Sequence, residues 1–275
     1  MKLLIDGDIL CYRAGFATDK TKYMTINPAG GEVSFWDDAK SAKESAFSND
    51  TVVWSRKETE PEDKALMLID VMLSDIRARY TSEAPTVHLF LSGVGNFRNA
   101  IATRATYKGN RSGAIPPTHL RAIRSHLVSK HGAVVSAGEE ADDLLGIAMT
   151  ANPGSICASI DKDLLQLPGR HYDFVKKEEV TISPKEAWLN FYSQVISGDS
   201  TDNVPGLTGY GPVKARKALE GLKNNRACWL KVTELYRAEF GPKAEQYALE
   251  CARLVYARRS VGDMFDAPQE AKAAA

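Results

Sequence analysis

Leu3-Leu4-Ile5-Asp6-Gly7-Asp8 is a short apolar run that ends abruptly at carboxylates. A run of this kind predicts a buried strand that stops at Asp6. The pattern recurs at residues 156–160, where an apolar stretch leads into Asp161-Lys162-Asp163. In open sheets of parallel strands, ligands bind beyond the carboxyl ends of the strands. We therefore expect Asp6 and Asp161 to lie together at a ligand-binding edge of a sheet.

Strands and helices alternate over roughly the first 180 residues, which predicts an α/β fold with a mostly parallel central sheet flanked by helices. Besides the two strands above, the patterns indicate helices over 60–80, 118–130 and 140–150, and strands over 87–91 and 133–135. Ser183 and Pro184 mark a helix start, and the chain beyond them is expected to be helical to about Arg259. This divides the chain into a catalytic domain, residues 1–182, and a helical lobe, residues 183–275. Residues 24–53 are expected to form a hairpin or insertion.

Composition excludes several classes of protein. The 275 residues are 44% hydrophobic, enough for a real core, yet they contain no apolar run long enough to predict a membrane span. An acid as early as Asp6 argues against a secretory signal. The four cysteines are far apart and lack a Cys-x-x-Cys spacing, which argues against a zinc site or disulfide framework and fits a cytoplasmic protein.

Charge is balanced in total, at 35 basic and 35 acidic residues, but it is segregated along the chain. Residues 98–131 carry seven Lys or Arg and no acid, and residues 139–202 carry twelve acids against five bases. Residues 213–259 are again basic, with eleven bases against five acids. The order suits a phosphate-binding surface around a metal centre, although three ordinary solvated faces would look the same.

Four acidic groups occur at the ends of expected elements. They are Asp6 with Asp8, Glu139-Glu140-Ala141-Asp142-Asp143, Asp161 with Asp163, and Asp199 with Asp202. Any one group could serve only a helix cap or a turn. If they converge, each like-charge pair at ~4 Å costs on the order of 4 kcal/mol at an effective dielectric constant near 20, and divalent cations would supply the counter-charge. Oxygen ligands favour Mg²⁺ or Mn²⁺, and two such ions activate water and stabilise the leaving oxygen in phosphodiester hydrolysis.

A glycine-rich turn, residues 206–217, follows the last acidic group. Its Gly206, Gly209 and Gly211 permit close approach of the backbone to phosphate, and Lys214, Arg216 and Lys217 add positive charge. The turn is no Walker loop, and alone it would be read as an ordinary turn.

Within the acid-free segment, Tyr107 is expected to stack on an unpaired base. Arg98, Arg104, Lys108 and Arg111 are expected to contact DNA there. The alternative is a solvated loop with a half-buried tyrosine.

These residues resemble the flap endonuclease and 5′–3′ exonuclease family from Leu3 to about Leu219. Five motifs carry the resemblance in order: Asp6-Gly7, Tyr107-Lys108-Gly109-Asn110-Arg111, Glu140-Ala141-Asp142-Asp143, Ser159-Ile160-Asp161-Lys162-Asp163, and Gly198-Asp199 through Ala215. The compact size is similar to stand-alone bacteriophage members.

The resemblance implies a PIN-like core, a helical arch over about residues 97–131, and an H3TH-type helix–turn–helix over about 199–219. The matched metal-binding acids are Asp6, Glu140, Asp142, Asp143, Asp161, Asp163, Asp199 and Asp202. Lys108 matches the lysine that contacts the scissile phosphate and, with Asp161 and Asp163, is expected to carry catalysis. Tyr107 matches the aromatic residue that meets the displaced strand. The glycine turn matches a duplex-binding element that often carries K⁺.

One position departs from the family pattern. Ser92 stands where the family usually has an acid, at the end of the strand before the arch. Asp8 is not a standard family ligand, but it could compensate.

The function that follows is a structure-selective 5′–3′ exonuclease or flap endonuclease with two Mg²⁺ ions, which Mn²⁺ can replace. Its expected partners are DNA 5′ ends, flaps or nicks, RNA–DNA hybrids, and replication proteins during phage replication or repair in a host cytoplasm. The chain is expected to be monomeric and to bind no membrane. Two alternatives stay open: a PIN-type ribonuclease, and a non-catalytic binder of DNA junctions, which Ser92 would favour.

Overall fold

The computed structural model describes residues 1–268 except 27–30, 32 and 46–51. The chain forms two compact units. Unit 1 comprises Met1–Ile9, Ile76–Ala114 and His131–Ala275, and unit 2 comprises Leu10–Asp75 and Ile115–Lys130.

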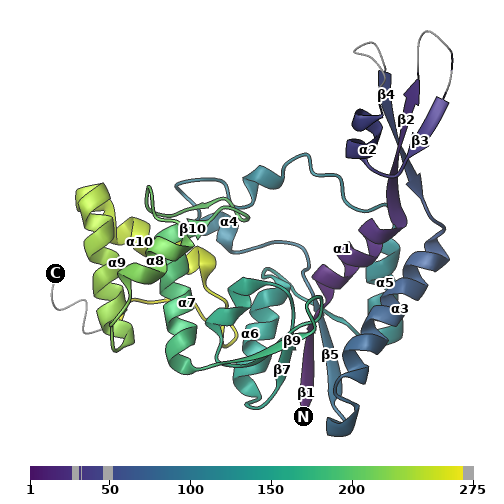
Figure 1. The fold of residues 1–275 in the computed structure, drawn as a ribbon. Coiled ribbons are helices and arrows are strands. Elements are labelled where there is room, and N and C mark those ends of the chain that lie inside the picture. Colours follow the sequence, from purple (N-terminus) through teal and green to yellow (C-terminus); the bar gives the residue numbers. More distant parts are fainter. Residues whose placement is uncertain (27–30, 32, 46–51, 269–275) are drawn as a thin grey trace. The chain divides into compact units, whose positions relative to one another are not determined.

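Unit 1 is built on a six-stranded sheet in the order β6-β5-β1-β7-β8-β9 (Figure 1). Its strands are β1 (Lys2–Asp6), β5 (Thr86–Leu91), β6 (Val134–Val135), β7 (Ile156–Ala158), β8 (Gly169–Asp173) and β9 (Glu178–Ile182). All neighbours are parallel except β8 and β9. The predicted α/β fold with a mostly parallel sheet flanked by helices is therefore confirmed.

β1 is the centre of this sheet because its side chains are apolar on both faces. Leu3, Leu4 and Ile5 are almost completely buried. Leu3 pairs with Val87 of β5 on one side and with Ile156 of β7 on the other. A strand buried on both faces reads as a continuous hydrophobic run, which is why this short stretch predicted it correctly.

Helix α6 (Ala141–Ala151) packs against β1, β5 and β7. Leu145 and Met149 on its buried side join Leu4 and Cys157 of the sheet in one core. Because α6 begins at the carboxyl edge of the strands, this packing carries the acids of its first turn to that edge.

The remainder of unit 1 is mostly helical. It comprises α4 (Arg98–Ile101), the 3₁₀ turns η1 (Thr81–Glu83), η2 (Gly109–Arg111), η3 (Lys162–Gln166) and η4 (Gly241–Lys243), and α7 (Pro184–Ser197), α8 (Pro212–Ala218), α9 (Asn225–Phe240) and α10 (Ala244–Val255). Ser183 caps α7 as predicted, accepting a hydrogen bond from the Glu186 amide. The fully buried Tyr192 and Tyr236 lie in the core shared by α7, α9 and α10. The expected run of helix is interrupted by a two-residue ladder, β10 (Gly198–Asp199) with β11 (Val204–Pro205), and α10 ends at Val255, before Arg259.

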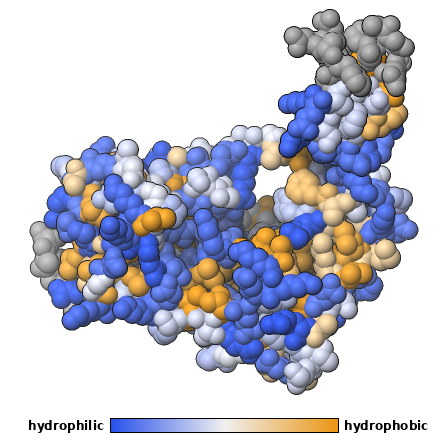
Figure 2. All heavy atoms as spheres, viewed as in Figure 1, coloured by the Kyte–Doolittle hydropathy of each residue, from blue (hydrophilic) through white to orange (hydrophobic). Residues whose placement is uncertain are grey.

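Unit 2 contains the greater part of α1 (Gly7–Thr18) and α3 (Glu62–Ala78), together with α5 (Leu120–His131) and an antiparallel ribbon. The ribbon consists of β2 (Asp19–Ile26), β3 (Val33–Trp36) and β4 (Val52–Thr59) in the order β3-β2-β4, with α2 (Ala39–Glu44) beside it. The expected hairpin or insertion over residues 24–53 is therefore a hairpin within a longer ribbon, apart from its residues 27–30, 32 and 46–51, which lie outside the described part. Phe35 and Trp54 are more than half exposed on it, and hydrophobic atoms are visible there in Figure 2.

Elements that had no counterpart in the sequence-based expectations include α1, α2, β8 and β9. Helix α1 starts directly at Gly7, between Asp6 and Asp8. Asp8, an acid in the first turn, is the one feature of the sequence there that favours a helix start. None of the helices in the described part of the chain is long and apolar enough to span a membrane.

The contact between α6 and the segment after α10 provides a test of the packing. Gly146 lies inside α6, and a Cβ added there would lie 2.3 Å from the carbonyl oxygen of Arg258. Helix propensity alone predicts that Gly146→Ala stabilises the protein by about 1 kcal/mol. We expect the opposite sign, a loss of about 1–3 kcal/mol, because the clash forces the backbone apart. Urea denaturation of both proteins measures the difference, and a more stable variant would contradict the packing described here.

Candidate active site

Two acids lie at the ends of neighbouring parallel strands. Asp6 is the last residue of β1 and is only 2% exposed, and Asp161 follows β7 as the cap of η3. Ser159 lies between them: its hydroxyl donates to Asp6 Oδ2 at 2.8 Å and accepts from the Asp161 amide at 3.0 Å. The parallel pairing of β1 and β7 therefore brings these predicted site residues to one edge.

Asp8 and Ser92 meet at the same edge. The Ser92 amide donates to Asp8 Oδ2 at 2.9 Å, and the Ser92 hydroxyl accepts from the Ala141 amide at 2.9 Å. The Ser92 hydroxyl thus bonds to the start of α6. The nearby carboxylate is that of Asp8, which accepts from the Ser92 amide.

The first turn of α6 contributes three acids that differ in their surroundings. Glu140 caps the helix, and its capping box with Asp143 satisfies both backbone amides. Asp142 is half-buried, and desolvation together with the charges of Asp6 and Asp161 raises its pKa well above the ordinary value.

Asp143 is completely buried and forms a two-pronged ion pair with Arg98, at 2.7 and 2.9 Å. Arg98 is 3% exposed, and it also donates to the carbonyl oxygens of Leu254 and Tyr256. The expectation that Arg98 contacts DNA is corrected by this geometry, since its donors are engaged inside the protein. The Asp143 carboxylate, expected as a metal ligand, is likewise engaged by the guanidinium.

Asp199 and Asp202 come from the ladder and loop after α7. Asp199 accepts hydrogen bonds from the Thr201 amide at 2.7 Å and from Asp163. These bonds outweigh burial and lower the pKa of Asp199. For its partner Asp163, burial and Asp199 raise the pKa to about 8.

The Tyr107-Lys108 segment closes over two further acids. The Tyr107 hydroxyl lies 2.8 Å from Glu140 and 2.7 Å from Asp202, and Lys108 Nζ pairs with the same two carboxylates. Arg111 also pairs with Asp202. Burial alone would lower the pKa of Lys108, but the two acids raise it, which keeps the lysine charged.

Tyr107 is only 7% exposed and its ring packs in the core of the helical region. The prediction that Tyr107 stacks on an unpaired base is therefore corrected for this conformation: the ring has no free face to offer.

A small pocket lies among these groups. Its polar lining includes Tyr107, Glu140, Asp142, Asp163, Asp199 and Asp202, and its cavity volume is ≈ 30 Å³. A space of this size holds one or two water-sized ligands. It suits an ion with its waters and is too small for a nucleotide.

The donor set fits a hard divalent cation. Burial and neighbouring carboxylates raise the pKa of Asp6 to about 7 and also raise the pKa of Asp161. These shifts report negative charge that lacks full compensation. Within the described part of the chain, three carboxylates of this pocket do not lie within 4.8 Å of one another. An ion here would therefore bind through one or two carboxylates, with water completing its coordination, as is usual for Mg²⁺.

The glycine turn is shaped by contacts within unit 1. Arg104 donates to the carbonyl oxygens of Pro205 and Gly206, so its guanidinium faces the protein. The Thr208 amide and hydroxyl both donate to Glu239. Gly209 has a φ of +73°, which favours glycine.

The three cations predicted to contact DNA after this turn differ in availability. Lys214 Nζ lies 3.2 Å from the Gly209 carbonyl and 4.0 Å from the centre of the Tyr210 ring. Arg216 is engaged by Glu186 and Asn190. Lys217 is exposed.

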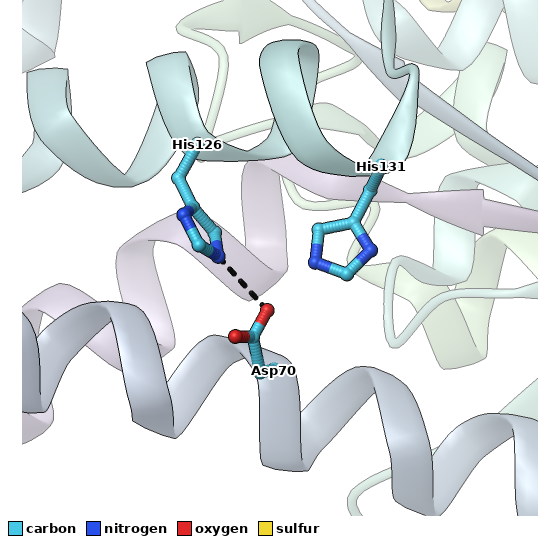
Figure 3. Close-up of side chains that lie close together, drawn as sticks. All are labelled: Asp70, His126 and His131. Atoms are coloured by element: carbon cyan, nitrogen blue, oxygen red, sulfur yellow. Dashed lines mark hydrogen bonds and ion pairs between the residues drawn. The ribbon is translucent and has the colours of Figure 1, made fainter.

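A group that the sequence reading missed stands on α3 and α5. His126 Nε2 lies 2.9 Å from Asp70 Oδ1 (Figure 3). Lys130 pairs with Asp70 Oδ2 at 2.7 Å. Figure 3 also draws His131, the last residue of α5. An ordinary ion pair between the helices accounts for Asp70, because Lys130 already neutralises it.

Several structural residues had no signal in the sequence. Glu239, Glu250 and the Arg98–Asp143 pair act through partners distant along the chain. A buried arginine in an acid-free segment looks the same as a surface arginine in sequence.

Comparison with known proteins finds partial similarity to enzymes that act on DNA. It matches no family model. It is 34% identical over 137 residues to a DNA polymerase I of Rhizobium leguminosarum, covering 42% of this chain and 13% of the polymerase. It is 27% identical over 150 residues to the flap endonuclease Xni of Shewanella baltica, covering 50% of this chain and 56% of that protein. The chain thus spans about half the length of this endonuclease.

The fold has a solved counterpart. The T5 5′-exonuclease, in a structure with bound zinc ions, superposes with a TM-score of 0.51 at 18% identity, over 68% of this chain and 80% of that one. This likeness concerns the fold. The chain is thus similar in part of its sequence to a flap endonuclease and a DNA polymerase I, and in its fold to a 5′-exonuclease.

Proposed function

We propose that this protein is a metal-dependent 5′ nuclease that hydrolyses phosphodiesters near the 5′ ends of DNA, at flaps or nicks. One observation carries the proposal: carboxylates from the start of α6, from η3 and from the β10 loop line a small pocket, and the raised pKa of Asp163 among them reports incompletely compensated charge. The names of the relatives, a flap endonuclease and a 5′-exonuclease, supply the substrate class. RNA–DNA hybrids, a phage role, replication-protein partners and the balance between exonuclease and flap cutting belong to the same proposal.

The proposed cofactor is Mg²⁺, with Mn²⁺ as a substitute, bound as two ions. The ligands we assign are Asp6, Glu140, Asp142, Asp161, Asp163, Asp199 and Asp202. Asp143 is left out because Arg98 neutralises it, and Asp8 is a candidate because it stands beside Ser92. When bound, the ions supply an activated water and stabilise the oxygen that leaves.

Lys108 is proposed to hold the scissile phosphate. It is a half-buried cation, its side chain 28% exposed, and its present partners Glu140 and Asp202 are proposed ligands. Ions on these acids would release the ammonium, which could then stabilise charge on the phosphate.

The DNA-binding elements are proposed from position and charge. The first is an arch over about 97–131, in the proposed catalytic domain, residues 1–182. The second is a helix–turn–helix of H3TH type over about 199–219, in the proposed helical lobe, residues 183–275. Among the cations near the glycine turn, the exposed Lys217 is the best placed to meet phosphate. A K⁺ ion on the carbonyls of the turn is part of the same proposal.

A cleavage assay on a 5′-flap duplex labelled at either end tests the proposal. We expect Mg²⁺-dependent release at the junction or stepwise from the 5′ end, and none with chelator. Tight flap binding without cleavage under Mg²⁺ or Mn²⁺ would instead support a non-catalytic junction binder, for which Ser92 is the favouring feature.

Asp161→Asn should lower the cleavage rate by about a hundredfold or more, because a charge that would hold the cofactor is lost. Flap binding measured by anisotropy should change little. Asp75→Asn, an exposed change on α3, is the matched control. Near-normal turnover of the Asp161 variant would remove Asp161 from the centre.

Lys108→Ala and Lys217→Ala should separate chemistry from docking. We expect the first to lower kcat on the order of a hundredfold with little change in KM, since its charge acts at the phosphate. The second should weaken flap binding and reduce the salt dependence of log Kd by about one unit, as expected for one lost phosphate contact. Single-turnover kinetics and salt titrations measure both, and exchanged effects would reverse the two assignments.

Thermal stability without divalent ions should fall as pH rises. The pKa values of Asp6 and Asp163 are raised from 3.8 to about 7 and about 8, so the folded state binds more protons than the unfolded state between these limits. The contribution of these two acids to stability is therefore greatest below their unfolded pKa values and is lost as pH rises through the folded ones. Acids with lowered pKa values, such as Asp19, act in the opposite direction only at lower pH.

Melting curves in chelator, measured from acid to alkaline pH, should show this fall, and Mg²⁺ should reduce it. Asp163→Asn should flatten the profile, because an amide can donate to Asp199 without titrating. A profile that rises with pH in chelator would show that the acids are compensated by other groups.

A further inference from the structure

Glu250 is a buried carboxylate on α10, 7% exposed, that is absent from the lining of the acidic pocket. It accepts hydrogen bonds from the Thr103 amide at 2.7 Å, from the Arg104 amide at 2.9 Å and from the Thr103 hydroxyl. Three bonds from two consecutive residues fix the backbone at that point. Such a carboxylate stabilises a particular path of the chain, because amides left unpaired in the interior are costly.

The residues fixed by Glu250 begin a segment that leads to the pocket. We call residues 103–111 the strap. Its second residue, Arg104, has its guanidinium 4.7 Å from the ring centre of Phe240 and 5.0 Å from that of Tyr247. The same guanidinium donates to the Pro205 carbonyl at 2.7 Å. The start of the strap is therefore held by the helices α9 and α10.

The other end of the strap is held by the loop that carries Asp202. The Lys108 amide donates to the Asp202 carbonyl at 2.8 Å, and Asn203 donates to the Thr106 carbonyl at 2.9 Å. Lys108 itself has a φ of +54°, a left-handed conformation that is unfavourable for residues other than glycine. A strained conformation persists only where its surroundings determine it.

These two anchorages differ in kind. The downstream one consists of the acid loop itself, whose charges would be rearranged by a bound ion. The upstream anchorage, where Glu250 binds Thr103 and Arg104, is separate from the pocket. Arg104 lies four residues before Lys108. It can therefore keep its geometry while the acids exchange partners.

We propose that Glu250 is a positioning residue, which fixes the start of the strap and thereby places the Lys108 ammonium at the acidic pocket. The inference rests on the proposed function for its catalytic consequence, but its structural part, the ordering of the strap, is independent of nuclease activity.

Glu250→Met and Glu250→Gln form a matched pair of variants. Both replacements have nearly the same length, but Met has no acceptor, whereas the Gln carbonyl can accept both backbone amides that now bond to one carboxylate oxygen. Glu245→Met, exposed on the same helix, controls for the substitution itself.

Hydrogen–deuterium exchange of the full chain reads the strap directly. We expect residues 103–111 to exchange faster in Glu250→Met, and to remain near wild type in Glu250→Gln and Glu245→Met. Unchanged protection of the strap in Glu250→Met would overturn the proposal, whether or not the protein cuts DNA.

Flap cleavage then tests the catalytic consequence. Glu250→Met should lower kcat roughly tenfold to a hundredfold with little change in KM, as small misplacements of a catalytic group do. In a Lys108→Ala background it should cause no further loss, since the two changes act through one ammonium. Additive losses, or failure of Glu250→Gln to restore kcat, would show a merely structural role.

If Glu250→Met fails to fold, Thr103→Val removes one of the three bonds with less disturbance. It should cause a smaller change in exchange and in kcat in the same direction, and no change in either would overturn the proposal. Wild-type inactivity on flaps would refute the proposed function alone, because the exchange result stands without it.

Discussion

Negative charge buried at the carboxyl edge of the sheet is the constraint around which this protein is arranged. β1 and β7 deliver Asp6 and Asp161, and the packing of α6 on the sheet delivers Asp142. Burial and mutual repulsion raise the pKa of all three. Each unit of such a shift corresponds to about 1.4 kcal/mol between the two protonation states. A fold that keeps these acids together needs positive charge nearby. Arg98 and Lys108 both supply positive charge, but in different ways.

Two modes of compensation are present, and they suit different roles. Arg98 has a side chain 4% exposed and is held by backbone carbonyls as well as Asp143, so its charge is fixed and its role is structural. Removing one partner of such a buried pair is strongly destabilising. Lys108 is more exposed, and its ammonium is shared between Glu140 and Asp202. Its charge can be exchanged for another cation, which is what a site that takes up ions and phosphate requires.

The sequence predicts those features that depend on neighbours in the chain. The apolar run ending at Asp6, the strand before Asp161 and the Ser183 cap are local patterns, and all three elements were placed correctly. The pairing of Arg98 with Asp143 and of Glu250 with the strap joins residues 45 and about 147 positions apart, which no local period reveals. Tyr107 was misread for the same reason: an aromatic residue in a basic segment looks exposed until the helices that bury it are known.

The glycine turn and the acidic pocket are connected by backbone contacts and by the Arg104 side chain. Arg104 holds the carbonyls of Pro205 and Gly206, and the Asp202 carbonyl holds the Lys108 amide. Residues of the strap therefore touch both the turn and the acids within a few residues of each other. If the turn binds a duplex, as proposed, these hydrogen bonds and the short intervening chain would fix the position of the duplex relative to Lys108. Short, rigid links of this kind place a phosphate with the accuracy that positioning demands.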